Sequence, residues 1–350
     1  MAKKKSLAEV AEEKGPDPAE VQHLKAEIRR LHKKLNRQQG STEAMVSSVV
    51  SILSDLPPVP IPPKPKASRK KQREYALLHL SDFQAGAASP NFNTEILRER
   101  IIDRMLPKVR KIIEARRSAA RLDDIHIALG GDQVDGSNLR ANQAWEVCED
   151  VMQQSMVTAP EIQVQAIQDV MSYFPNVEVS SVAGNHGRSG PFKRDANPDR
   201  VNWDNVCAMA TKQRLQPHID KGRLKFHVEV DDFMHVFQIG GARVMSVHGH
   251  QFRGGGGFAG IPLYAIARLV AKWAISLPPE QQFDIVIMGH FHQSVQWTFG
   301  PKQIYINGSP QTGSAFVKEV IGSENRPAQR LLIFNDELPY PIADHILYLD

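Results

Sequence analysis

The sequence has only two cysteines among its 350 residues and no apolar stretch long enough to cross a bilayer. Cys148 and Cys207 lie far apart and belong to no CxxC motif, so a thiolate zinc site is not expected. The basic start at residues 1–6 leads into charged residues rather than the apolar segment of a secretory signal. We therefore expect a cytoplasmic protein that makes no membrane contact.

The net charge of +4 hides an asymmetry along the chain. Residues 1–73 carry 16 Lys and Arg against 8 Asp and Glu, whereas the remaining residues carry 27 against 31. A basic region can follow the phosphate backbone of a nucleic acid. Solvated linkers are often rich in lysine too, so the charge by itself leaves both interpretations open.

The N-terminal region divides into three segments, at residues 1–40, 41–56 and 57–74. In the first, Asp17 as N-cap, Pro18 at the first helical position and Glu20 behind it predict the start of a helix. Its apolar residues follow heptad spacing up to Gly40, namely Val21, Leu24, Ile28, Leu31 and Leu35. This helix could mediate self-association, bind a partner protein or dock on the catalytic domain.

A second short helix is predicted within residues 41–56. Six prolines between Pro57 and Pro65 then exclude a helix and favour an extended polyproline spacer. This spacer ends in a run of basic residues, which makes residues 57–74 a proline-rich basic linker. The rest of the chain, residues 75–350, is predicted to be the catalytic domain.

Within that domain, five polar clusters each follow a short, largely apolar run. The runs lie at residues 75–80, 125–129, 177–183, 243–247 and 284–288, and the clusters are Ser81–Gln84, Gly131–Asp135, Gly184–His186, Val247–His250 and Gly289–His292. Ligand-type side chains thus recur where a strand ends and a loop begins. Open α/β sheets carry their chemistry at that edge.

The clusters supply seven candidate metal ligands: Asp82, Gln84, Asp132, Asn185, His248, His290 and His292. Carboxylates, amide oxygens and imidazoles are the ligands expected for ions such as Mn, Fe(II), Zn or Co. Seven ligands are too many for one tetrahedral ion but suit two ions that share a carboxylate. Two such ions about 3.5–4 Å apart can hold a phosphoryl group and generate hydroxide at neutral pH. Asp132 or Asn185 alone would be read as a turn residue, but turns do not require the paired imidazoles of His290 and His292.

The order Asp-x-His, Gly-Asp-x-x-Asp, Gly-Asn-His, His-Gly, Gly-His-x-His resembles that of the calcineurin-like metallophosphoesterases across residues 75–350. A narrower resemblance to phage-type exonucleases and phosphoesterases is carried by Asn185–Arg188, Tyr305–Pro310, Arg326-Pro327 and Leu331–Phe334. The chain is also similar to the nuclease subunit of double-strand-break repair complexes. The resemblance implies a four-layer αββα sandwich of two mixed sheets, here with an N-terminal helical extension.

The same resemblance implies how two divalent ions are held. Asp132 would bridge them, and Asp82 and His292 would hold the first ion. The second would be held by Asn185, His248 and His290. Manganese is the ion expected first, with iron, zinc, cobalt and magnesium as alternatives.

His186 would stay off the metals and act on the substrate, and Asp135 would orient its ring. Gln84 departs from the family pattern, because histidine usually stands at this position. An amide oxygen can coordinate an ion but gives it less charge, so either Gln84 is a weak ligand or it is not a ligand. His250 could replace His248 as a ligand, although a loop histidine held by hydrogen bonds is the preferred interpretation.

Helical periodicity covers residues 94–120, residues 145–174 with a break near Pro160, and residues 262–275. After Arg223 the pattern changes to strands, at residues 224–230, 233–239, 243–247, 284–288, 295–299, 303–306, 330–334 and 346–349. An α/β half followed by a strand-rich half fits two sheets packed face to face with helices outside.

The leading functional hypothesis is a binuclear metal-dependent phosphodiesterase that acts as a DNA nuclease. Two alternatives remain: a phosphatase or phosphodiesterase for small molecules or phosphoproteins, and a scaffold with a vestigial metal site. Turnover of DNA, of a small phosphodiester and of a phosphomonoester would separate them.

Overall fold

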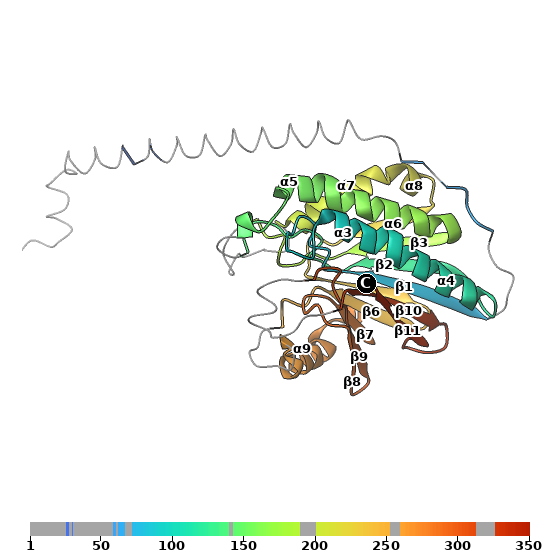
Figure 1. The fold of residues 1–350 in the computed structure, drawn as a ribbon. Helices are drawn as coiled ribbons and strands as arrows, with labels where there is room; N and C mark the ends of the chain where they lie inside the picture. The colour runs from blue at the N-terminus through green and yellow to red at the C-terminus, as the bar shows by residue number, and fades with distance from the viewer. Residues whose placement is uncertain are drawn as a thin grey trace, which may run out of the picture. The chain divides into compact units, whose positions relative to one another are not determined.

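A computed structural model describes residues 26, 27, 30, 59, 60, 62–66, 72–139, 143–189, 201–252, 260–312 and 326–350 (Figure 1). The chain divides into two compact units, Met1–Pro57 and Pro58–Asp350. In the first unit, Ala26, Glu27 and Arg30 are helical, and the rest of the two predicted N-terminal helices lies outside the described residues. Residues 59–60 and 62–66 of the predicted linker form neither helix nor strand.

The second unit contains two mixed sheets. The larger sheet has the strand order β11-β10-β1-β2-β3-β4. Its strands are β1 (Arg73–Leu80), β2 (Arg121–Leu129), β3 (Asn176–Ser181), β4 (Leu224–Val228), β10 (Ala328–Asn335) and β11 (Ala343–Tyr348). The strands β1 to β4 run parallel, so their carboxyl ends lie at one edge of the sheet, while β10 and β11 are antiparallel to their neighbours.

The smaller sheet has the order β5-β6-β7-β9-β8. Its strands are β5 (Met234–Ile239), β6 (Ala242–Val247), β7 (Ile285–Met288), β8 (Val295–Phe299) and β9 (Lys302–Ile306). The central strands β6, β7 and β9 are parallel, and the edge strands β5 and β8 are antiparallel to them. This sheet therefore also gathers the carboxyl ends of its central strands at one edge.

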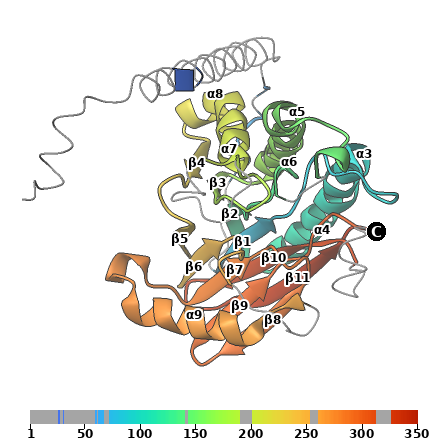
Figure 2. The same cartoon turned by 90° about the vertical axis from the view of Figure 1, so that its left-hand side faces the viewer.

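Helices cover the outer face of each sheet, which gives the predicted four layers (Figures 1 and 2). The outer face of the larger sheet packs against α3 (Thr94–Arg98), α4 (Leu106–Arg117), α6 (Ala159–Tyr173), α7 (Trp203–Arg214) and α8 (Gln216–Asp220). The helix α9 (Leu263–Ser276) packs on the outer face of the smaller sheet. The two-sheet α/β architecture predicted from the sequence is confirmed.

The strand β10 shows how the layers are built from an alternating pattern. Leu331 and Ile333 belong to the core beneath the helices, whereas Leu332 and Phe334 belong to the core between the sheets. Successive side chains of a strand point to opposite faces, and both faces of β10 are covered. This explains why the strand reads as a continuous apolar run rather than an alternating one.

Two helix predictions need correction. The segment 94–120 forms α3, a π-helical stretch η1 (Glu99–Met105) and α4, and the segment 145–174 forms α5 (Val151–Gln153), a π-helical stretch η3 (Gln154–Thr158) and α6. The helix continues through Pro160. The wider π-helical turn before it tolerates a residue without a backbone N–H and gives the proline ring more room. The second helix begins at Val151 instead of Trp145, since the Asp150 side chain caps it by accepting from the N–H of Gln153.

The helices α7 and α8 were not predicted from the sequence. No helix among the described residues has the length and apolar character needed to span a membrane. The predicted strands are all present, with ends that differ from the prediction by a few residues. Such shifts at element boundaries are ordinary.

Candidate metal centre

The five polar clusters follow β1, β2 and β3 of the larger sheet and β6 and β7 of the smaller one, and they meet at one edge. The ring Nδ1 of His248 donates to the carbonyl oxygen of Gly130 at 2.8 Å, which joins the two sheets. The backbone N–H of His290 donates to Asp82 Oδ1 at 2.9 Å, and that of His186 to Asp132 Oδ1 at 2.8 Å. Clusters far apart in the sequence are thus neighbours in the fold.

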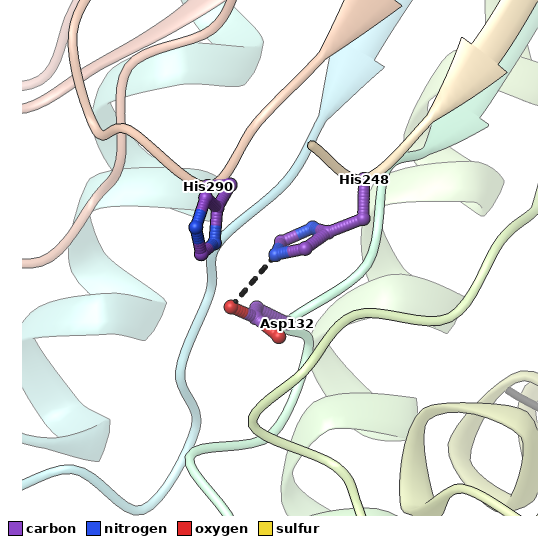
Figure 3. A group of neighbouring side chains, drawn as sticks. All are labelled: Asp132, His248 and His290. Carbon is purple, nitrogen blue, oxygen red and sulfur yellow. Dashed lines mark ion pairs between the residues drawn. The ribbon is translucent and has the colours of Figure 1, made fainter. Parts of the chain in front are cut away.

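Asp132, His248 and His290 point toward one another (Figure 3). One ligand atom from each of these side chains lies within 4.8 Å of the other two. Nε2 of His248 is 2.9 Å from Asp132 Oδ2. Since His248 uses Nδ1 to hold its ring in place, Nε2 is left to face the carboxylate, as in metal-binding histidines fixed by a second contact.

Asp82, Gln84 and His292 form the adjoining part of the site. Nε2 of His292 lies 3.4 Å from Asp82 Oδ1 and 3.2 Å from Gln84 Nε2. Gln84 Nε2 is also 3.4 Å from Nε2 of His186. The Gln84 side chain therefore lies inside the site rather than pointing to solvent.

Three of the predicted ligands carry a buried polar atom that has no hydrogen-bond partner, namely Asp82 Oδ2, Gln84 Oε1 and Asn185 Oδ1. Asp132 Oδ2 and His248 Nε2 face each other at 2.9 Å. Each carboxylate uses its other oxygen to accept a backbone N–H. A buried polar atom without a partner costs about 1–3 kcal/mol, so a group of them at one place marks a candidate ligand site. Divalent cations fit this set of oxygen and imidazole donors.

The backbone of the same loops is strained. Among the residues that the structure describes, positive φ at non-glycine positions occurs at Asp82, Gln84, Asp132, His290 and His292. All five are predicted ligands, and left-handed backbone at such residues clusters at functional sites. Gly184 lies against Asp132 so closely that a Cβ at this position would overlap the Asp132 carboxylate and its backbone N, so only glycine fits there.

The charges around Asp132 favour a cation. Burial by itself would raise the pKa of Asp132, but His248 and His186 hold it well below its usual range. Burial has the opposite effect on a histidine and would lower the pKa of His248. The Asp132 carboxylate outweighs burial and raises the pKa of His248 to about 9. The negative potential that stabilises a proton on His248 would also stabilise a metal ion in its place.

His186 lies beside this centre and is held by Asp135. Its Nδ1 is 3.0 Å from Asp135 Oδ1 and 3.1 Å from the Asp135 carbonyl oxygen. Gln143 in turn donates to the Asp135 carbonyl and, at 3.3 Å, to its Oδ2. Burial would lower the pKa of His186, but Asp132 and Asp135 raise it to about 9. The ring can therefore carry a proton at neutral pH, with Nε2 facing the centre.

His250 occupies a different position from His248. The centroid of its ring lies 5.5 Å from that of His248 and 6.4 Å from that of His290. The group of mutually close ligand atoms contains His248 and not His250. Gln251 contacts Nε2 of His250 at 3.4 Å.

Asp204 is a site residue that the sequence analysis missed. Its Oδ2 accepts from the N–H groups of Asp132 and Gly184, both at 2.7 Å, and its Oδ1 from those of Gln133 and Val134 at 2.9 and 3.2 Å. One buried carboxylate thus fastens two ligand loops together. The sequence clue to this region is Asn202, two positions before Asp204, because asparagine is a common helix N-cap. In the structure, Asn202 also donates to the carbonyl oxygen of Gly184.

We expect Asp204→Asn to weaken both the loops and the metal site. The amide has one acceptor oxygen, so two of the four N–H groups lose their partner. At about 1–3 kcal/mol for each lost partner, the free energy of unfolding should fall by a few kcal/mol in urea titrations with chelator present. Metal affinity should fall about 10–100-fold, as for other residues that position ligands. Asp220→Asn, on the exposed end of α8, is the control; equal metal affinity in the two variants would contradict the role assigned to Asp204.

Gln84→His should tighten metal binding. The side chain already lies in the site, and histidine tolerates positive φ better than most residues. An imidazole is a better donor than an amide for these ions, so the Mn²⁺ concentration for half-maximal activity should fall by about tenfold or more. Gln213→His, on the exposed side of α7, provides the control. An unchanged metal titration would show that residue 84 is not a ligand.

No protein-family model matches the sequence, and no curated protein matches it. Wild-type Vps29 from Entamoeba histolytica complexed with Zn²⁺ aligns over 79% of this chain and 99% of its own, with 14% identity and a TM-score of 0.32. A predicted phosphoesterase from Streptococcus pneumoniae TIGR4 aligns over 79% and 99%, with 13% identity and a TM-score of 0.33. An archaeal phosphodiesterase aligns over 78% and 99%, with 12% identity and a TM-score of 0.33.

Proposed function

We propose that this protein is a binuclear metal-dependent phosphodiesterase. The observation that supports the proposal most directly is the convergence of buried carboxylate, amide and imidazole side chains from loops of both sheets at one edge. Carboxylate, amide and imidazole donors without thiolates suit manganese, iron, zinc or cobalt, with magnesium as a further alternative. Manganese remains the ion of first choice.

In this proposal Asp132, whose Oδ2 lies 2.9 Å from His248 Nε2, would be the ligand that both ions share. Asp82 and His292, with Gln84 beside them, would hold one ion. Asn185, His248 and His290 would hold the other. When bound, two such ions stabilise charge on a phosphoryl group and activate water at neutral pH.

His186 is proposed to donate a proton to the leaving oxygen. Its Nδ1 is occupied by Asp135, which leaves Nε2 directed at the site, 3.9 Å from Asp132 Oδ2. The Asp132 and Asp135 carboxylates raise the pKa of the ring, which favours its protonated form. Asp135, itself held by Gln143, fixes the orientation of the ring.

DNA is the proposed substrate. The basic excess of residues 1–73 supplies charge for a phosphate backbone. Trp145 is 88% exposed and ends the short helix η2 (Gln143–Trp145), whose Gln143 contacts Asp135. An exposed indole two residues from Gln143 can stack on a base, which contributes about 1–3 kcal/mol per base. Arg188, two residues beyond His186, has a buried Nε without a partner and could contact a phosphate.

The function is tested by turnover of three substrates after chelation and return of Mn²⁺. We expect hydrolysis of bis(p-nitrophenyl) phosphate and of end-labelled DNA, and much slower hydrolysis of p-nitrophenyl phosphate. Faster turnover of the phosphomonoester would favour a phosphatase. Absence of turnover with manganese, iron, zinc, cobalt and magnesium would favour a scaffold with a vestigial site.

The DNA proposal has its own variant. Trp145→Ala should raise the KM for single-stranded DNA while leaving hydrolysis of the small diester unchanged, because only DNA offers bases for stacking. Phe299→Ala, at an exposed aromatic on the edge strand β8, is the matched control. Equal KM values for DNA in the parent and Trp145→Ala would contradict base stacking there.

Cleavage that does not weaken with rising salt would contradict a backbone contact by the basic region.

A further inference from the structure

A second group of potential metal ligands lies outside the centre described above. One ligand atom each from His227, Glu229 and His235 lies within 4.8 Å of the other two. Nε2 of His227 is 3.1 Å from Glu229 Oε2, and Nδ1 of His235 is 3.8 Å from the same oxygen. The two imidazole rings stack with centroids 4.2 Å apart. None of these residues belongs to the proposed catalytic centre.

The group joins the two sheets at their edge strands. His227 belongs to β4, the last strand of the larger sheet, and His235 to β5, the first strand of the smaller one. Figure 2 shows β4 and β5 following one another on the same side of the unit. Glu229 lies in the loop that connects them. A ligand held by this group would therefore tie one sheet to the other.

The space between the sheets is polar at this side. Its apolar core contains Leu77 of β1 and Ile285 of β7, whereas His126 of β2 and His235 of the edge strand β5 flank Phe237. His126 already contacts Ser180 Oγ through Nε2 at 2.7 Å. At the edge strands β4 and β5, imidazole side chains thus take the place of apolar packing between the sheets. Edge strands have a partner on one side only.

Glu229 is already oriented toward the two histidines. Its Oε1 accepts from the N–H groups of Asp231 and Asp232, both at 3.1 Å, which leaves Oε2 facing the imidazoles. The side chains of Glu229 and His235 are 17% and 19% exposed, while that of His227 is 51% exposed. Two ligands are therefore fixed by the fold, and the third has room to adjust.

We propose that His227, Glu229 and His235 bind one zinc ion that fastens β4 to β5. Two imidazoles and one carboxylate form a zinc-binding set, and water completes four-coordination. Ligands about 2.0–2.2 Å from a tetrahedral ion lie about 3.3–3.6 Å from one another. The distance from His227 Nε2 to Glu229 Oε2, 3.1 Å, is slightly shorter than this range, and that from His235 Nδ1 to the same oxygen, 3.8 Å, is slightly longer. Small side-chain movements would bring both distances into the range.

The test compares the number of zinc ions bound per molecule by the full-length parent protein and by the full-length variant His227→Ala. With Zn²⁺ alone, equilibrium dialysis followed by elemental analysis should find one equivalent fewer in the variant, whatever the catalytic centre binds. His345→Ala, on the edge strand β11 at the other end of the larger sheet, is the control and should bind as much zinc as the parent. Equal zinc content in parent and His227→Ala would overturn the proposal.

Thermal unfolding gives a second readout. Zn²⁺ should raise the Tm of the parent and His345→Ala more than that of His227→Ala, because only an intact site ties the sheets together. Glu229→Gln keeps an oxygen for the N–H groups of Asp231 and Asp232 while it removes the charge, so its zinc-free Tm should stay near that of the parent. If Glu229→Gln keeps the full zinc content, the proposal fails even where His227→Ala is poorly folded.

Discussion

Asp132→Asn should abolish hydrolysis while the protein stays folded. The substitution removes the charge of the carboxylate whose Oδ2 faces His248 at 2.9 Å, but it keeps an oxygen for the N–H of His186 and leaves the backbone bonds to Asp204 intact. Asparagine also tolerates the positive φ found at this position. Metal-bound transition states are stabilised by several kcal/mol, so we expect a rate loss of about 10³-fold or more with bis(p-nitrophenyl) phosphate and Mn²⁺.

Two histidine variants accompany this measurement. His290→Ala should also abolish hydrolysis, because His290 belongs to the same close group of ligand atoms. His250→Ala should keep most of the activity, since its ring lies outside that group. Circular dichroism and the unfolding midpoint report whether each variant is folded. Rates near that of the parent for folded Asp132→Asn or His290→Ala would refute the two-metal assignment.

His186→Ala should lose about 10²–10⁴-fold in rate, the range of general acid–base catalysis. It should still bind two metal ions, because the His186 side chain is held by Asp135 and lies 3.9 Å from Asp132 Oδ2. The loss should be larger for DNA than for bis(p-nitrophenyl) phosphate. An alkoxide leaving group needs a proton, whereas p-nitrophenolate leaves readily without one.

Metal counting and the choice of leaving group separate the possible roles of His186. A fall from two bound ions to one in His186→Ala would show that His186 is a ligand. An equal loss of rate for DNA and for the aryl diester would contradict proton donation and indicate stabilisation of charge in the transition state. Asp135→Asn should lower the rate less than His186→Ala does, because it disturbs the orientation of the ring without removing it.

Much of this protein could be predicted from local sequence patterns. The candidate ligands Asp82, Asp132, Asn185, His248 and His290 each come a few residues after the start of a short apolar run. Strand periodicity and donor chemistry are local properties, so they predict both the strands and the polar loops behind them. The two-sheet α/β architecture was predicted in the same way. The roles of these residues remain predictions that the variants above test.

Some predictions failed because a residue's effect depends on its wider surroundings. Pro160 reads as a helix breaker, but a π turn ahead of it lets the helix continue. The helices α7 and α8 have weak apolar periodicity, since α7 buries polar side chains such as Asp204 and Asn205. The local signal near Asp204 is the N-cap residue Asn202, which indicates the start of a helix but not that the carboxylate behind it fastens two loops.

The sequence by itself determined which residue types end each strand, and hence the chemistry the site can offer. Only the tertiary structure decided that β10 from the end of the chain pairs with β1, that Gln84 faces His292, and that Asp204 ties the loop of Asp132 to that of Gly184. It also brought His227 against His235 from two different sheets. These contacts join residues distant in the chain, and strand register and sheet packing fix them, whereas periodicity describes only neighbours along the sequence.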